Sequence, residues 1–120
     1  MVGVKRGRKY VEHQDQVKVV QRVRAFHPGV IIAAIPNGGD RTASERVRLA
    51  SEGVLAGMPD LCVLRPSKGF HGLFVEMKTD VGVVGAAQRE IAGRLNAEGY
   101  LCLVARGADE AYRLIEEYLG

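Results

Sequence analysis

Two short fragments of the sequence carry the residue types that could do chemistry: Pro59-Asp60 before one apolar run, and Glu76-Met77-Lys78 at the end of the next. Side chains alternate across a strand, so Glu76 and Lys78 share one face while Met77 points to the other. If the two runs pair as a hairpin, Asp60 lies beside Glu76. Two carboxylates held that close repel each other unless a proton or cation joins them, and Mg²⁺ or Mn²⁺ suits such oxygen ligands.

An amine beside a pair of metal-binding carboxylates is typical of phosphodiester hydrolysis. Lys78 would orient or help deprotonate an attacking water, or neutralise a phosphate. The alternative is that Glu76 and Lys78 form a solvated pair on an edge strand, since Glu-x-Lys alone is a weak signal in a chain of 120 residues. The upstream Asp60 at hairpin spacing favours the metal-dependent hydrolase.

The composition indicates one globular domain, with a basic arm over residues 1–9 and the domain over residues 10–120. Hydrophobic residues make up 47% of the chain, and no apolar run approaches the ~20 residues of a membrane span. The N-terminus lacks the apolar core of a signal peptide, so we expect a cytoplasmic protein. The net charge of +3 and the KRGRK cluster at residues 5–9 favour a polyanion such as DNA, although basic ends are often merely solvated.

Hydrophobic periodicity and turn residues predict eight elements that position these groups. Helices are expected over about residues 10–27, 42–52, 85–98 and 108–119, and strands over 30–35, 61–64, 73–78 and 100–105. The connection 65–72 is short enough for an antiparallel hairpin, and the helix between the last two strands favours their parallel pairing. The order α-β-α-β-β-α-β-α predicts an α/β fold, a small mixed β-sheet flanked by helices.

Several motifs together resemble the VRR-NUC family of the PD-(D/E)xK nuclease superfamily. They are PNGGDR at 36–41, GMPDL at 57–61, LFVEMK at 73–78, Gln88 and GY at 99–100. Their order and spacing agree from about Glu12 to the C-terminus, as in a stand-alone member. The resemblance implies a restriction-endonuclease-like fold, with metal ligation by Asp60, Glu76 and the backbone carbonyl of Met77. It implies that Lys78 is the catalytic amine.

Two further residues are candidates for this site. The family carries an acid on its first helix, and Glu12, on one helical face with Gln16, would ligate a metal directly or through water. Alternatively Glu12 is a solvated first-turn acid, and Asp15 is a weaker substitute. Gln88 would hydrogen-bond the attacking water or a phosphate, or it is an ordinary surface residue.

Basic and amide residues outside the acidic pair are candidate contacts for the DNA backbone. They are Lys5, Arg6, Arg8, Lys9, Asn37 and Arg41. Arg46 and Arg48, on the helix that follows, fit a backbone contact and a merely solvated position equally well.

The sequence therefore predicts a Mg²⁺- or Mn²⁺-dependent DNA endonuclease that acts on duplex or branched DNA. Stand-alone members of the family that it resembles behave as homodimers that resolve four-way junctions, which implies a homodimer and a preference for branched DNA. Apolar surface for a dimer is expected from two groups of residues: Tyr112, Ile115, Tyr118 and Leu119 at one end, and Tyr10, Val11 and Val30 at the other. A non-catalytic DNA-binding module and a metal-dependent phosphohydrolase of small molecules remain alternatives.

Overall fold

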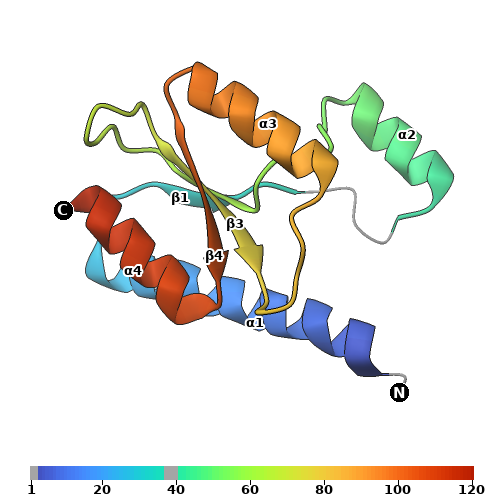
Figure 1. Ribbon diagram of the computed structural model, residues 1–120, viewed down its shortest axis with the longest axis horizontal. Helices are drawn as coiled ribbons and strands as arrows, with labels where there is room; N and C mark the ends of the chain where they lie inside the picture. The colour runs from blue at the N-terminus through green and yellow to red at the C-terminus, as the bar shows by residue number, and fades with distance from the viewer. Residues whose placement is uncertain (1–2, 37–40) are drawn as a thin grey trace.

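The computed structural model describes residues 3–36 and 41–120, with side chains from residue 11 onward. Its elements follow the predicted order, α-β-α-β-β-α-β-α (Figure 1). They are α1 (Gly3–Phe26), β1 (Ile32–Ala34), α2 (Ala43–Ser51), β2 (Leu61–Val63), β3 (Leu73–Lys78), α3 (Ala86–Ala97), β4 (Leu101–Arg106) and α4 (Ala108–Leu119).

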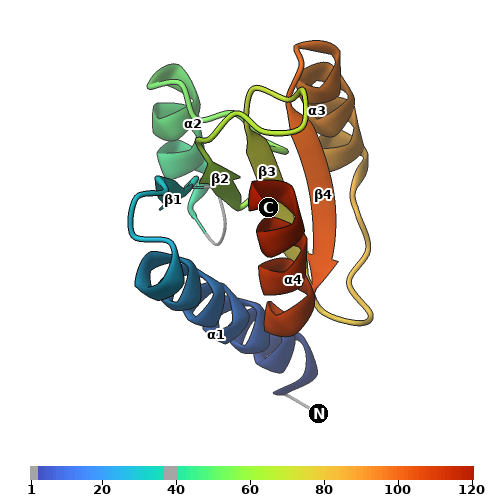
Figure 2. The same ribbon diagram turned by 90° about the vertical axis from the view of Figure 1, so that its left-hand side faces the viewer.

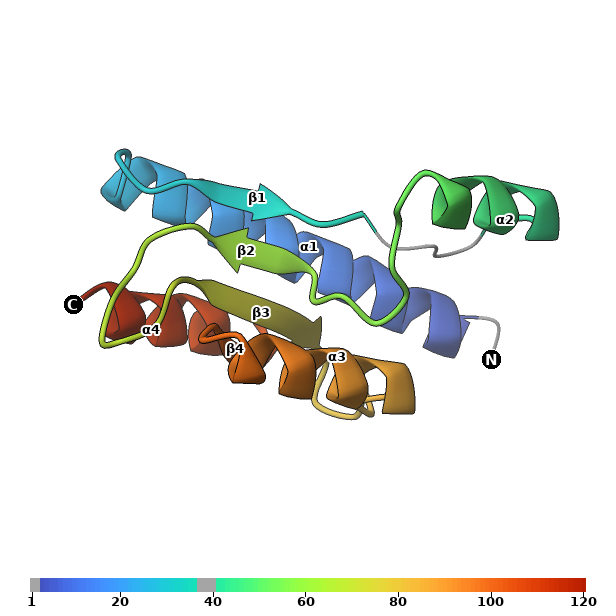
Figure 3. The same cartoon turned by 90° about the horizontal axis from the view of Figure 1, so that it is seen from above.

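The four strands form one mixed sheet in the order β1-β2-β3-β4 (Figure 3). β2 runs antiparallel to both of its neighbours, and β3 runs parallel to β4, with α3 as the crossover between them. The predicted hairpin and the predicted parallel pair are therefore both confirmed. Antiparallel pairing needs only a short connection, whereas parallel strands need a crossover of the kind that α3 provides.

Helices α1 and α4 pack against each other and cover one face of the sheet, while α3 lies on the other face beside β4 (Figure 2). The hydrophobic core lies between the α1–α4 pair and the face of the sheet that this pair covers. Its fully buried members include Val19 and Val23 of α1, Leu73 and Val75 of β3, and Ile115 of α4. Since alternate residues of β3 point into this core, Glu76 and Lys78 are directed to the opposite face, as the strand period predicts.

Helix α2 stands apart from the rest of the fold at the end of the chain segment that follows β1 (Figure 1). It has no buried residue. Thr42 caps its first turn: the Thr42 hydroxyl accepts a bond from the Glu45 amide, and the Glu45 carboxylate accepts one from the Thr42 amide. This capping box stabilises a short helix that has little packing to support it.

Two expectations are wrong in detail. The first helix begins at Gly3 rather than near residue 10, so the backbone of the basic segment 5–9 is helical, which suits lysine and arginine as good helix formers. Whether this segment acts as an arm separate from the domain stays a prediction. Tyr112, Ile115 and Tyr118 do not supply a dimer surface, because α4 buries them against α1 and the sheet.

The other residues expected on that dimer surface differ in how far they are exposed. Val11 is exposed, Val30 and Leu119 pack partly against the core, and the side chain of Tyr10 lies outside the described residues. Among the described helices, none is long and apolar enough to cross a membrane.

Candidate active site

Asp60 lies where β2 begins, opposite Glu76 on β3. The register pairs Leu61 with Val75, so the next position of the ladder places Asp60 against Glu76, as the hairpin spacing predicts. One carboxylate oxygen of Asp60, Oδ2, accepts a hydrogen bond of 2.7 Å from the backbone N–H of Met77. The side chain of Asp60 thus continues the ladder past the end of β2, and this bond fixes its position.

The backbone carbonyl of Met77 is directed to the same side of β3 as Asp60. In an antiparallel ladder the N–H and C=O of one residue point to the same neighbouring strand. Because the Met77 N–H reaches Asp60, its carbonyl oxygen faces the edge at which Asp60 lies. This direction agrees with a ligand role for the carbonyl.

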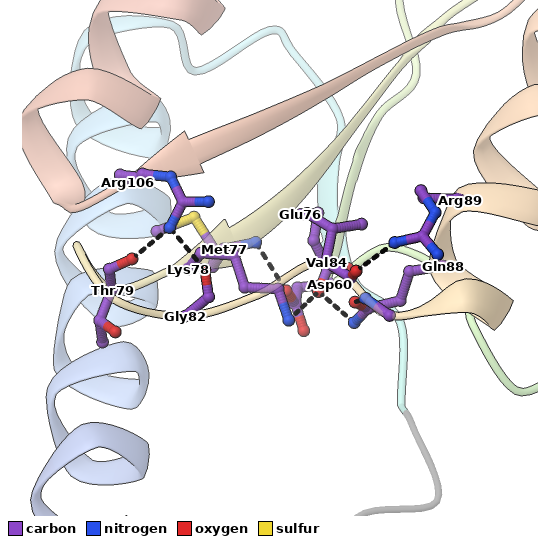
Figure 4. A network of polar contacts seen from close by, with 11 residues as sticks. Asp60, Glu76, Met77, Lys78, Thr79, Gly82, Val84, Gln88, Arg89 and Arg106 are labelled. Atoms are coloured by element: carbon purple, nitrogen blue, oxygen red, sulfur yellow. Dashed lines mark hydrogen bonds and ion pairs between the residues drawn. The ribbon is translucent and has the colours of Figure 1, made fainter.

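Glu76 is the one buried charged residue among the described side chains, with 7% of its surface exposed. Its Oε2 accepts a hydrogen bond of 2.7 Å from Gln88 Nε2 and lies 3.6 Å from Lys78 Nζ (Figure 4). Its Oε1 is also buried and no described group donates a hydrogen bond to it, although a proton shared between the Glu76 and Asp60 carboxyl groups would join the two. An unpartnered buried carboxylate oxygen is costly, and it indicates a position made for a cation or a proton.

Gln88 is held by contacts at both ends of its amide. It lies in the first turn of α3, where Gln88 Oε1 accepts a hydrogen bond of 2.8 Å from the backbone N–H of Gly85. The amide nitrogen is therefore turned toward Glu76. Gln88 reaches the site as its sequence position predicts, and in this structure it orients Glu76.

The electrostatics of the pair disfavour two negative charges at once. Burial, and after it the nearby Asp60 carboxylate, raise the pKa of Glu76 to about 7, and Lys78 opposes both effects. Burial also raises the pKa of Asp60, against the effect of the hydrogen bond from the Met77 amide. A divalent cation between the carboxylates would remove this conflict.

These residues line one cleft with a volume of about 380 Å³. Its walls are formed by Glu12, Arg46, Ala56, Gly57, Met58, Asp60, Glu76, Met77, Lys78 and Gln88. Glu12 of α1 therefore faces the site, as expected, whereas Asp15 and Gln16 do not line the cleft. The described residues nevertheless bring together no group of three or more His, Cys, Asp or Glu side chains that would hold a metal ion. Glu12 thus lies on the wall of the cleft and apart from the acidic pair.

The donor set of the acidic pair fits a hard divalent cation. Mg²⁺ is usually held by one or two carboxylates and keeps several of its waters, so Asp60 and Glu76 suffice as charged ligands. Glu76 Oε1 is a charged oxygen and the Met77 carbonyl is a neutral one, and the described residues that line the cleft include no cysteine or histidine. Whether Glu12 reaches such an ion, directly or through water, stays a prediction.

Only some of the residues that we expected to contact DNA have side chains among the described residues. The side chains of Lys5, Arg6, Arg8 and Lys9, and the whole of Asn37, lie outside the described residues. Arg41 is exposed, and its backbone carbonyl accepts a hydrogen bond of 2.7 Å from Arg46. Arg46 lines the cleft, whereas Arg48 forms an ion pair of 3.0 Å with Glu52.

The sequence did not indicate a role for Arg106 of β4, which holds in place the loop that follows Lys78. Arg106 Nη1 donates hydrogen bonds of 2.7 Å to the carbonyls of Thr79 and Gly82, in the loop that links Lys78 to α3 (Figure 4). Arg106 pairs with Lys78 in the parallel register of β3 and β4. The sequence alone does not give that register, so it could not place Arg106 beside the site.

Gly57 is a second residue whose role was not foreseen. It lines the cleft with a φ of +91°, and a Cβ atom there would lie 2.5 Å from the carbonyl oxygen of Ala87 in α3. Glycine therefore permits both the backbone conformation and the close approach of the loop to α3. This approach brings Asp60 and Gln88 to the same cleft.

Comparison with known proteins agrees with the fold and the family. A profile of the VRR-NUC domain matches residues 9–109. The chain is similar to a solved structure described as a VRR_NUC domain protein, at 26% identity and a TM-score of 0.78, over 91% of this chain and 88% of the other. A second, described as a VRR_NUC domain, is similar in fold, at 22% identity and a TM-score of 0.59, over 89% of this chain and 96% of the other. No significant match was found among curated proteins.

These likenesses confirm the expected nuclease-like α/β fold, in which a four-stranded mixed sheet is flanked by helices. The profile covers most of the chain, including every residue of the acidic pair and its neighbours. A nuclease-type function follows from the family. The chain belongs to the VRR-NUC family of nuclease domains.

Proposed function

We propose that this protein is a Mg²⁺- or Mn²⁺-dependent deoxyribonuclease that hydrolyses phosphodiester bonds at the cleft around Asp60 and Glu76. The observation that carries the proposal is the buried, unpartnered Oε1 of Glu76 beside a second carboxylate and an amine. A chain that used the fold only to bind DNA would have no need to hold two carboxylates that repel each other side by side, one of them buried. The net charge of +3 supports a polyanionic substrate.

Each residue of the cleft has a distinct task in this proposal. Asp60, Glu76 and the carbonyl of Met77 would hold the ion, with Glu12 contributing directly or through water. When bound, the divalent ion lowers the pKa of a coordinated water and stabilises negative charge on the phosphoryl oxygen.

Lys78 is suited to act on the water or the phosphate. Its side chain is only 14% exposed, and the contact of 3.6 Å with Glu76 keeps its amine at the metal site. From there Lys78 would orient the attacking water and offset the negative charge of the phosphate. Gln88 holds Glu76 in place and has a second amide hydrogen for the water or the phosphate.

The finer parts of the proposal concern substrate and assembly. We expect endonucleolytic cleavage with a preference for branched DNA or four-way junctions, carried out by a homodimer whose two sites face two strands. The support is the resemblance to members of the family that behave as homodimers and resolve four-way junctions. The dimer surface must differ from the one expected on α4, because Tyr112, Ile115 and Tyr118 of that helix are buried.

A panel of labelled DNA forms tests this function. Single-stranded DNA, linear duplex, flap and four-way junction are incubated with the protein in Mg²⁺ or Mn²⁺, and in a chelator. We expect cleavage only with metal, and most rapidly for the branched forms. Binding without cleavage under every condition would favour a DNA-binding module. Hydrolysis of small phosphate esters but not of DNA would favour the phosphohydrolase.

A further inference from the structure

Arg46 lines the same cleft as the acidic pair and belongs to α2, the helix that stands apart from the fold. It occupies the first turn of α2, where its backbone N–H donates a hydrogen bond of 3.0 Å to the carbonyl of Thr42. The capping box between Thr42 and Glu45 fixes this turn. Glu45 is therefore engaged with the helix end, and the side chain of Arg46 is exposed where it lines the cleft.

The charged side chains that line the cleft differ in whether a described residue of opposite charge pairs with them. Among the described residues that line it, three are acidic, Glu12, Asp60 and Glu76, and two are basic, Lys78 and Arg46. Lys78 is paired with Glu76. Arg46 forms no ion pair with any described acidic side chain, and the one side-chain hydrogen bond that it makes to a described residue is that of 2.7 Å from Nη1 to the carbonyl of Arg41. A guanidinium group has five N–H donors, and the described residues engage only one of those on Arg46.

We propose that Arg46 binds the non-bridging oxygens of a DNA phosphate in the cleft that it lines together with Asp60 and Glu76. This inference rests on the proposed nuclease function and assigns one contact to its substrate. The planar fork of an arginine matches two phosphate oxygens at once, which favours it over a lysine at this position. Because the acidic pair repels a phosphate, a cation in the cleft that no described acidic side chain neutralises supplies the attraction that the pair does not.

Arg48 provides a matched control on the same helix. It lies two residues further along α2, is exposed like Arg46, and forms an ion pair with Glu52. It does not line the cleft. Substitution of either arginine by alanine removes one positive charge from α2 and keeps a good helix former. Any difference between Arg46→Ala and Arg48→Ala therefore reflects position and not net charge.

The test is DNA binding in chelator, where no cleavage competes. Fluorescence anisotropy of a short labelled duplex is measured for the wild type, Arg46→Ala, Arg46→Lys and Arg48→Ala over a range of salt from about 50 to 200 mM. We expect Arg46→Ala to bind about tenfold more weakly at low salt and to reduce the slope of log K against log salt by about 0.9. Arg46→Lys keeps the slope, because it keeps the charge, and recovers part of the affinity. Arg48→Ala stays within about twofold of the wild type.

Cleavage with metal gives a second readout. If Arg46 holds a phosphate, Arg46→Ala raises the half-saturating DNA concentration more than it lowers the rate at saturation. Equal effects of Arg46→Ala and Arg48→Ala on affinity and on slope would overturn the inference. A wild type that binds DNA in chelator but never cuts it would overturn the nuclease, and the comparison of the two arginines would still decide the phosphate contact. A wild type that does not bind DNA would overturn both.

Discussion

Replacing Glu76 by glutamine should stabilise the metal-free protein at alkaline pH, although it removes a charged residue of the site. The reason is the raised pKa of Glu76, which moves from 4.5 to about 7 because of burial and the neighbouring Asp60. The folded protein then binds a proton more tightly than the unfolded chain does. Stability from this group is full below pH 4.5 and is lost as the pH rises toward 7.

The size of the effect follows from the shift. A difference of roughly 2.5 pKa units corresponds to about 3 kcal/mol of unfolding free energy, present at low pH and lost above pH 7. Glutamine keeps an oxygen acceptor for Gln88 and offers Asp60 an N–H donor, without a charge. We therefore expect Glu76→Gln and the wild type to differ little near pH 4.5, and the variant to be more stable by up to about 3 kcal/mol at pH 8.

Thermal unfolding in chelator measures this directly. For a domain of this size we expect the melting temperature of Glu76→Gln at pH 8 to exceed that of the wild type by roughly 5 to 15 °C. Glu90→Gln, at an exposed position of α3, is the matched control and should stay within about 0.5 kcal/mol of the wild type. Added Mg²⁺ should stabilise the wild type and not Glu76→Gln. A difference that is absent at pH 8, or equal at pH 5 and pH 8, would refute the reasoning.

Two further predictions concern the cleft wall. Glu12→Gln should slow cleavage less than Asp60→Asn does, because Glu12 lies apart from the acidic pair. Single-turnover cleavage rates of the two variants over a range of Mg²⁺ concentrations measure the difference. A wild-type rate for Glu12→Gln at low Mg²⁺ would show that Glu12 is only a solvated residue. Gly57→Ala should destabilise the fold by at least about 2 kcal/mol and impair cleavage, because its Cβ would lie 2.5 Å from the Ala87 carbonyl oxygen. Gly53→Ala, with a φ of +106° but open space around it, isolates the backbone strain and should cost about 1 kcal/mol in denaturant unfolding. Equal losses for the two glycine variants would contradict the role given to the Ala87 contact.

Much of the site could be predicted because it depends on the two-residue period of a strand. The spacing of Glu76 and Lys78 placed both on the face away from the core, and the length of the hairpin connection placed Asp60 opposite Glu76. The position of Gln88 at the start of a helix brought its side chain to the same place. Each of these inferences uses only local geometry.

What could not be predicted depends on contacts between distant segments. Arg46 and Arg48 cannot be told apart from the sequence, because both are arginines of the same short helix. Only the fold shows that Arg46 lines the cleft while Arg48 pairs with Glu52. The apolar spacing of α4 is the same for a helix that packs on the core and for one that forms a dimer. The structure decides this for Tyr118, which is 2% exposed.

The most direct test of the account is DNA cleavage by purified wild type and Glu76→Gln, assayed side by side at pH 8 with Mg²⁺ and with chelator. The account predicts rapid cutting by the wild type with Mg²⁺, none with chelator, and none by Glu76→Gln under either condition. Because the variant should be at least as stable as the wild type without metal, its inactivity would not be due to unfolding. Metal-dependent cutting that persists in Glu76→Gln would contradict the assignment of the acidic pair as the catalytic centre.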